Sequence, residues 1–180
     1  FVPGNHCVSA LSKPEFLRVS GAKAAPYSLD RAGIRLVVLD SCFSADGRPY
    51  GGWSFDWKEA RLPDSELGWL DRDLERAKFS AIVFLHHCLD VDTVYAVRNA
   101  PEVRALLERS RKVRAVFQGH THTDSLRTLN GIHYRTFRSM VDGCGPGSGA
   151  YGIVEVNADG AISIRGFQGM TSETLPAPAW

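Results

Sequence analysis

Five of the six histidines in this chain of 180 residues lie in three short clusters whose side chains could bind metal ions. The clusters are His6, the pair His86 and His87, and the pair His120 and His122. Neutral imidazole is a good ligand for zinc, manganese, iron and similar ions. A single buried histidine is more often a core residue than a ligand, but five histidines in three clusters favour a metal site.

Each histidine cluster directly follows an apolar segment that is typical of a β-strand. These segments are residues 1–3, 81–85 and 115–118. Because ligands gather at the carboxyl ends of strands in α/β sheets, we expect three strands to bring the clusters to one edge of one sheet. Asn5 adds a neutral oxygen ligand. The clusters supply no carboxylate, although a two-metal site needs an anionic bridging oxygen to hold two cations ~3.5–4 Å apart.

The order of the motifs resembles the calcineurin-like metallophosphoesterases. Gly4-Asn5-His6, the strand-terminal His86 and Gly119-His120-Thr121-His122 look like that family's last three motifs, GNH[D/E], a strand-terminal His and GHxH. A GNH alone is a weak signal and a GHxH alone a moderate one. All three in order, each behind a strand-like segment, make a specific signal that covers roughly residues 1–170.

The resemblance implies an α/β fold, a four-layer αββα sandwich with two metal ions at its top edge. It implies that Asn5, His86 and His120 bind one metal and that His122 binds the other. His6 would lie beside the metals without binding them and would stabilise or protonate the reacting phosphate. The implied reaction is hydrolysis of a phosphate mono- or diester by a metal-bound hydroxide at a binuclear site of manganese, iron or zinc ions.

The choice of His86 rather than His87 as the ligand rests on the family, which commonly places the ligand first in such a pair. Two further positions depart from the family's pattern. Cys7 stands where Asp or Glu usually follows GNH, and a thiol orients His6 only weakly. Cys88 replaces the proline that often follows the strand-terminal histidine pair.

The family's opening motifs, Asp-x-His and Gly-Asp-x-x-Asp, would lie upstream of Phe1. We therefore expect residues 1–170 to be the C-terminal portion of a single metallophosphoesterase domain, with residues 171–180 as a tail. The first strands of the sandwich would be missing, so exposed strand edges would leave the isolated chain poorly stable. A missing N-terminal segment or a second chain, as in a homodimer, would have to complete the site.

The expected substrate is a small phosphorylated molecule, with nucleotide-type phosphodiesters among the candidates. Tyr27-Ser28, Leu39-Asp40-Ser41 and Leu67-Gly68-Trp69-Leu70 look closest to two branches of the family. One branch is cyclic-nucleotide phosphodiesterase-like, and the other cleaves ADP-ribose and CDP-alcohols. The alternatives are a catalytically inactive binding or scaffold domain and a mononuclear metal-binding module.

Composition excludes several other classes of protein. The chain is 44% hydrophobic and 23% charged, with a formal net charge of +1, so neither a nucleic acid polymer nor a membrane is an expected partner. No apolar run approaches the ~20 residues that a membrane span needs. The four cysteines are widely spaced, which argues against a zinc ribbon. We expect Cys42 and Cys144 to be buried small hydrophobes. The sequence leaves the compartment open.

The elements that must position the histidines alternate between strands and helices. Apolar runs at residues 34–40, 81–85 and 115–118 predict strands buried on both faces. Residues 14–19 predict a short helix. A longer helix begins near Pro63, where the apolar residues that follow lie on one helical face.

The rest of the chain predicts a third helix and two hairpins. Asn99 and Glu102 resemble a capping box at the start of that helix. Asn130-Gly131 and Asp159-Gly160 predict β-hairpins. The Gly-rich residues 142–149 lack the Lys-Ser/Thr ending of a P-loop and predict a plain connection.

Residues 43–61 predict a surface loop or short hairpin that carries Trp53, Phe55 and Trp57 at every second position. Packing of these aromatic side chains under the loop is the favoured interpretation. Stacking on a nucleotide base is the alternative.

Overall fold

The computed structural model describes residues 1–52 and 55–177, so Trp53 lies outside the described residues. In chain order its elements are α1 (Asn5–Ala10), α2 (Lys13–Ser20), β1 (Tyr27–Arg31), β2 (Ile34–Val38), the 3-10 helix η1 (Trp57–Glu59), α3 (Asp64–Arg76), β3 (Ser80–Phe84), α4 (Ala100–Ser110), β4 (Val113–Gln118), β5 (Ser125–Leu129), β6 (Ile132–Thr136), β7 (Tyr151–Val156), β8 (Ile162–Phe167) and β9 (Glu173–Leu175).

The larger sheet has six strands in the order β1-β2-β3-β4-β6-β5. Its inner strands β2, β3, β4 and β6 are parallel, and the outer strands β1 and β5 pair antiparallel with their neighbours. Every residue of β4 is buried, as expected for a strand covered on both faces. The predicted strands at residues 34–40, 81–85 and 115–118 are thus confirmed as the centre of this sheet.

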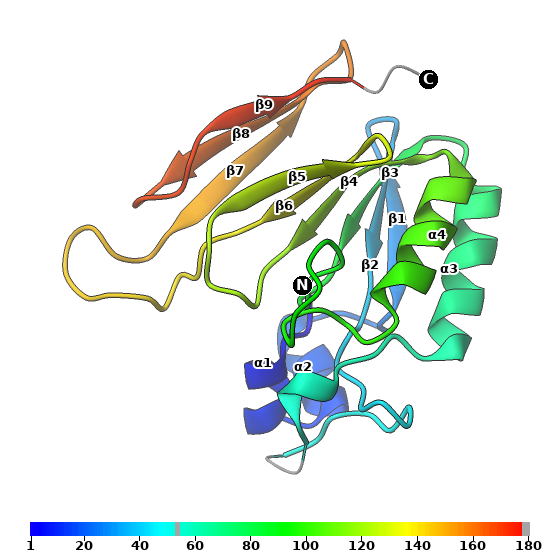
Figure 1. Cartoon of the computed structure of the whole chain (residues 1–180), viewed down its shortest axis with the longest axis vertical. Helices are drawn as coiled ribbons and strands as arrows, with labels where there is room; N and C mark the ends of the chain where they lie inside the picture. Colours follow the sequence, from blue (N-terminus) through cyan, green and yellow to red (C-terminus); the bar gives the residue numbers. More distant parts are fainter. Residues whose placement is uncertain (53–54, 178–180) are drawn as a thin grey trace.

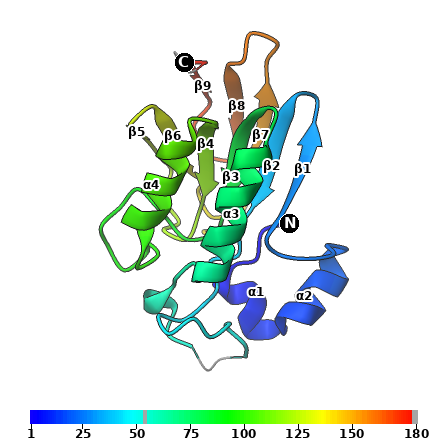
Figure 2. The ribbon, with the colours of Figure 1, turned by 90° about the vertical axis from the view of Figure 1, so that its right-hand side faces the viewer.

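Helices α3 and α4 cover one face of the six-stranded sheet, and the antiparallel sheet β7-β8-β9 covers the other (Figures 1 and 2). One core lies between the helices and the sheet and includes Leu70 and Leu107. The other lies between the two sheets and includes Phe117 and Ile164. The expected α/β sandwich is confirmed, with one helical layer and two sheets formed by the described residues.

The second sheet is joined to the loop that follows β4. The buried Arg135 forms ion pairs with Asp124, at the end of that loop, and with Glu173 in β9. Asp124 also accepts a hydrogen bond of 2.6 Å from the amide of Thr171. Part of the segment expected as a tail is therefore a strand, in which Leu175 is buried.

Local sequence signals gave mixed results. The two hairpins are present as β5–β6 and β7–β8, and the helix predicted over residues 14–19 is α2. The strand expected at residues 1–3 is absent, because these residues join no strand ladder and Gly4 is the N-cap residue of helix α1. Within the described residues, no helix is long and apolar enough to cross a bilayer.

Two further expectations were confirmed only in part. Asn99 is the N-cap residue of α4, as expected, and its side-chain amide donates to Glu102 at 3.3 Å, but its side chain accepts no capping hydrogen bond. Instead its side-chain oxygen accepts from the backbone amide of Leu62, and its side-chain NH2 donates to the carbonyl of Leu62. These bonds fix the loop before α3 to the start of α4. Cys144 is exposed because it lies in the Gly-rich surface loop, whereas Cys42 is buried as expected.

Glu66 is a buried acid at the start of α3. Its Oε1 accepts a hydrogen bond of 2.6 Å from the amide of Asp40, which forms an ion pair with Lys13. Burial raises the pKa of Glu66 to about 8, and the negative charge of Asp40 contributes. The folded protein therefore holds a proton on Glu66 that the unfolded chain releases above its ordinary pKa of 4.5.

We predict that replacing Glu66 with Gln makes the free energy of unfolding less dependent on pH. Because the folded pKa is raised, stability from this group is present below pH 4.5 and is lost as the pH rises toward about 8. Gln keeps the acceptor for the Asp40 amide but has no proton to lose. Urea denaturation across this range should show that the free energy of unfolding of the variant rises relative to that of the wild type, by at most about 1.4 kcal/mol per pH unit. The matched variant Glu75→Gln, at an exposed position of α3, should follow the wild type. Parallel curves for all three proteins would contradict the prediction.

Candidate metal site

The loops after β3 and β4 are held against each other at the carboxyl edge of the larger sheet. The amide of Gly119 donates to the carbonyl of His86 at 3.0 Å, and the Cys88 thiol donates to the carbonyl of Gly119 at 3.2 Å. These bonds continue the parallel pairing of β3 and β4 beyond the strand ends. As a result, His86, His87 and His120 form a group whose ligand atoms all lie within 4.8 Å of one another.

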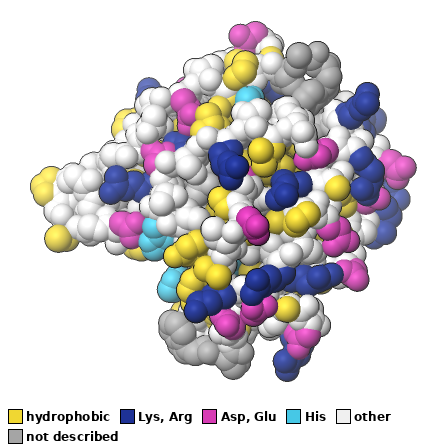
Figure 3. All heavy atoms as spheres, viewed as in Figure 1, with side chains coloured by type: hydrophobic (Ala, Val, Ile, Leu, Met, Phe, Trp, Pro, Cys, Tyr) yellow, Lys and Arg dark blue, Asp and Glu magenta, His cyan; other side chains and the backbone are white. Residues whose placement is uncertain are grey.

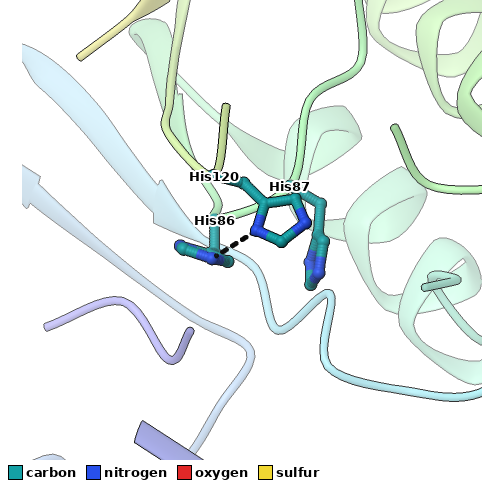
Figure 4. A group of neighbouring side chains, drawn as sticks. All are labelled: His86, His87 and His120. Atoms are coloured by element: carbon teal, nitrogen blue, oxygen red, sulfur yellow. Dashed lines mark hydrogen bonds between the residues drawn. The ribbon is translucent and has the colours of Figure 1, made fainter. Parts of the chain in front are cut away.

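Asn5, His86 and His120 point their polar atoms at one another. His86 Nε2 lies 2.7 Å from Asn5 Oδ1 and 3.1 Å from His120 Nδ1 (Figure 4 shows the second contact). One neutral oxygen and two imidazole nitrogens are a donor set that zinc, manganese and iron accept. The residues that the sequence assigned to one metal are therefore brought together, and their chemistry fits a metal ion.

His87 lies on the other side of His120 (Figure 4). Its ring is fully buried, and its Nδ1 shares a hydrogen bond of 2.8 Å with the hydroxyl of Ser41. Its Nε2 is buried without a partner, and its ring centre lies 4.4 Å from that of His120. His87 is thus near the site, but one of its two nitrogens is already in use.

Burial keeps the three clustered imidazoles neutral. It lowers the pKa of His86 to about 3 and of His120 to about 4, and neighbouring histidines contribute to both shifts. The pKa of His87 is also well below its ordinary value, again mainly through burial. Neutral imidazole is the form that binds metals, so no proton needs to leave before an ion binds.

His122 and His6 lie apart from this cluster. His122 is exposed, and its Nδ1 is 2.9 Å from Asp142 Oδ1 in the Gly-rich loop. His6 is an exposed residue in the first turn of α1. The structure thus brings together three of the five residues named from the sequence. The other two line one pocket together with Asn5 and His120.

The backbone around the cluster is unusual in two places. His120 and His122 have φ angles of 69° and 60°, a left-handed conformation that costs a non-glycine residue of the order of 1 kcal/mol or more. Gly4 packs against the His86 ring, where an added Cβ would lie 3.0 Å from Nδ1. A larger residue at position 4 would push the His86 ring away from Asn5.

The pocket beside the cluster has a volume of about 460 Å³ and is lined by histidines, among them His120, and by aromatic rings. Trp57 and Tyr95 stack with their ring centres 5.6 Å apart, and each lies edge-on to His120. Phe55 also lines this pocket and packs against the main core. Sequence reasoning named Trp57 but missed Tyr95 and Asp142, for which no motif or spacing gave a signal.

Comparison with known proteins supports the resemblance seen in the sequence. No protein-family model matches the chain. It is 29% identical to a manganese-dependent ADP-ribose/CDP-alcohol diphosphatase of Oryza sativa subsp. japonica, over 89% of this chain and 63% of that protein. It is 28% identical to a 3',5'-cyclic-nucleotide phosphodiesterase of Nostoc sp., over 74% of this chain and 48% of that protein. The two names correspond to the two branches that the sequence resembles.

A solved structure shares the fold. The crystal structure of a dimetal phosphatase from Danio rerio matches with a TM-score of 0.77 at 19% identity, over 97% of this chain and 70% of that chain. This likeness confirms the fold expected from the sequence. The chain spans between 45% and 63% of the length of the curated relatives it matches.

We predict that protonation of His87 destabilises the fold at acidic pH. Because burial lowers its pKa, stability from this group is present above pH 6.5, the ordinary histidine value, and is lost as the pH falls below it. Urea denaturation in a chelating buffer should show the stability gap between wild type and His87→Asn narrowing on acidification, by up to about 1.4 kcal/mol per pH unit.

The variant Ser41→Ala is the matched control, since it removes the hydroxyl partner and keeps the titrating ring. It should lower stability while retaining the wild-type dependence on pH. The prediction is contradicted if the free energy of unfolding of His87→Asn differs from that of the wild type by the same amount at every pH.

Proposed function

We propose that this chain is part of a metal-dependent phosphoester hydrolase in which Asn5, His86 and His120 bind one ion and His122 helps to bind a second. The single observation that carries the proposal is the convergence of Asn5 Oδ1 and His120 Nδ1 on His86 Nε2, at 2.7 and 3.1 Å. The relatives named as phosphodiesterases and diphosphatases, and the shared fold of a dimetal phosphatase, support it.

The choice of His86 over His87 is supported by their contacts. His86 Nε2 meets both other proposed ligands, whereas the Nδ1 of His87 is occupied by Ser41. When bound, divalent ions such as manganese supply positive charge to the phosphate oxygens and an activated water. The protein's own part is to fix the ligands on strand ends and to present His6 from the pocket rim, where it would stabilise the reacting phosphate.

The carboxylate ligands would come from outside the described residues. The clustered ligand groups are all histidines, so neutral donors alone would face two cations. β7 is an edge strand of the smaller sheet and carries the exposed residues Tyr151 and Ile153, so further strands could pair with its free edge. We propose that an N-terminal segment or a second chain, as in a homodimer, completes both the sheet and the site.

The proposed substrate is a small phosphoester of nucleotide type. Trp57 and Tyr95 stack beside His120 on the pocket wall, and bases stack on aromatic faces. A base held there would leave its phosphate near the histidines. The named activities of the relatives, on cyclic nucleotides and on ADP-ribose or CDP-alcohols, involve substrates of this kind.

The alternative is a domain that binds a single metal, or a phosphorylated ligand, without hydrolysis. One observation favours it. Among the described residues, the ligand atoms that converge on His86 are one oxygen and one further imidazole nitrogen, without a carboxylate. The two proposals differ in metal content and in turnover, and one experiment measures both.

We predict that the intact protein binds about two manganese ions and hydrolyses a phosphodiester, and that His120→Ala abolishes both properties. Loss of a ligand should lower kcat/KM by at least about 100-fold, because even residues that only orient ligands are worth 10–100-fold. His86→Ala should behave in the same way, whereas His87→Ala should retain metal. Metal content is measured after dialysis, and activity is measured with ADP-ribose and a cyclic nucleotide.

The matched control is His133→Ala. His133 lies in β6 and bonds Thr128 of the hairpin, outside the site, so its loss should leave metal content and turnover unchanged. Bound metal without turnover in the wild type would favour the binding domain. Metal lost from His87→Ala but retained by His86→Ala would reverse the assignment of the ligand.

We predict that Trp57→Ala raises KM for a nucleotide substrate by about tenfold, since stacking one base contributes about 1–3 kcal/mol. The KM for an aliphatic phosphoester should stay near its wild-type value, because such a substrate has no base to stack. Steady-state kinetics with both substrates tests this, with Tyr151→Ala as a control at an exposed aromatic residue of β7. An equal rise in KM for both substrates would assign Trp57 to packing alone.

A further inference from the structure

A second pocket lies at the opposite end of the six-stranded sheet from the histidines. It has a volume of about 360 Å³ and is lined by residues that include Lys78, Arg111, Arg114, Asp159 and Gly160. These residues come from the connection of α3 to β3, the connection of α4 to β4, the start of β4 and the β7–β8 turn. This end of the sheet is remote from α1 and α2 (Figure 1).

Arg114 reaches this pocket from a β-bulge. Ala81 of β3 pairs with Val113, and the next residue, Ile82, pairs with Ala115, so Arg114 is the extra residue in β4. A bulge redirects a side chain that would otherwise follow the alternation of the strand. Here it places a long cationic side chain in a pocket that Lys78, Arg111 and Asp159 also line.

The guanidinium of Arg114 is buried. Only 5% of the residue is exposed, and its Nε and Nη2 atoms have no hydrogen-bond partner among the described residues. Gly160 lies so close that an added Cβ would be 3.1 Å from Nη2. Burial lowers the pKa of Arg114, and nearby Asp159 acts in the opposite direction. An unpaired buried charge is costly, so it points to a partner that the described residues do not provide.

Arg135, unlike Arg114, is a buried arginine whose charge is paired within the fold. Arg135 is also buried, but it forms ion pairs with Asp124 and Glu173 and donates to the carbonyls of Ser125 and Thr136. Its charge is therefore compensated from within the fold. Arg114 has no such set of partners among the described residues.

The pocket rim adds positive charge. Lys78 and Arg111 are exposed residues that line it, while the neighbouring Lys112 is engaged by three carbonyls at the end of α3. Among the described residues, four cations line the pocket, Lys78, Arg111, Lys112 and Arg114, against the single carboxylate of Asp159, which leaves an excess of three positive charges. In the space-filling view, basic and acidic side chains lie together along the edge formed by α3 and α4 (Figure 3).

We propose that Arg114, Lys78 and Arg111 form a binding site for a phosphate-type dianion, separate from the histidine site. The excess of positive charge in the pocket suits a dianion better than a monoanion, and a guanidinium presents paired donors to a tetrahedral oxyanion. The proposal does not depend on the function of the histidines, because it rests on groups at the other end of the sheet.

The test is a calorimetric titration with inorganic phosphate, in a chelating buffer at constant ionic strength. The wild type should bind phosphate saturably, and Arg114→Met should lose this binding. The exposed variant Lys78→Ala should bind about tenfold more weakly, since one charged hydrogen bond contributes about 1.5 kcal/mol. Asp159→Asn should bind more tightly, because it removes the opposing charge.

Two control variants distinguish this site from general surface charge and from the histidine site. Arg109→Gln, at an exposed position of α4 paired with Asp71, should bind phosphate like the wild type. His120→Ala should also do so, since it alters only the proposed metal site. Arg114→Met removes an unpaired buried charge, so its Tm without phosphate should equal or exceed that of the wild type. If this variant fails to fold, the opposite effects of Lys78→Ala and Asp159→Asn decide.

Three results would overturn the proposal. The first is the absence of saturable binding up to about 10 mM, beyond which affinity has little meaning for a specific site. The second is equal phosphate binding by wild type, Lys78→Ala and Asp159→Asn. The third is binding of acetate as tight as that of phosphate, which would reject a dianion site.

Discussion

The convergence of His86 and His120 depends on backbone pairing that continues past the ends of β3 and β4, through the hydrogen bond from the amide of Gly119 to the carbonyl of His86. Parallel strands end at the same edge of a sheet, but their loops diverge unless something holds them. This bond extends the pairing of β3 and β4 into the loops and brings the two histidines to the same place. Asn5 is added from the start of α1, where Gly4 leaves room for the His86 ring. The site is thus built from strand ends and one short helix. Among the described residues that converge, the helix supplies the only oxygen ligand.

The sequence predicted the sheet well because its central strands are buried on both faces and carry continuous apolar residues. It also placed His86 and His120 correctly at strand ends. It failed where a contact with a distant segment decides the local structure. Asn99 has the residue type of a helix cap, yet Leu62 takes its amide. Asp142, which contacts His122, lies in a loop whose glycines gave no sign of this contact. Pairings of that kind depend on tertiary geometry, which residue type and spacing do not encode.

Buried charged and titratable groups divide the molecule into regions with different chemistry. At the carboxyl edge of the larger sheet, burial keeps the imidazoles neutral and ready to bind metal. At the start of α3, burial keeps Glu66 protonated. At the far end, Arg114 is a guanidinium without internal partners for its Nε and Nη2 atoms, whereas Arg135 has several. The cost of burying each group is met in different ways: by neutralising it, by pairing it, or by leaving it for a ligand.

The network of Arg135, Asp124 and Glu173 has a consequence for how the chain can be divided or recombined. Asp124 ends the loop that carries His120 and His122, and Glu173 belongs to the last strand of the smaller sheet. The smaller sheet is therefore not a detachable module. A chimaera that exchanged it for the equivalent part of another protein would also need to bring a compatible partner for Arg135, or the histidine loop would lose its anchor.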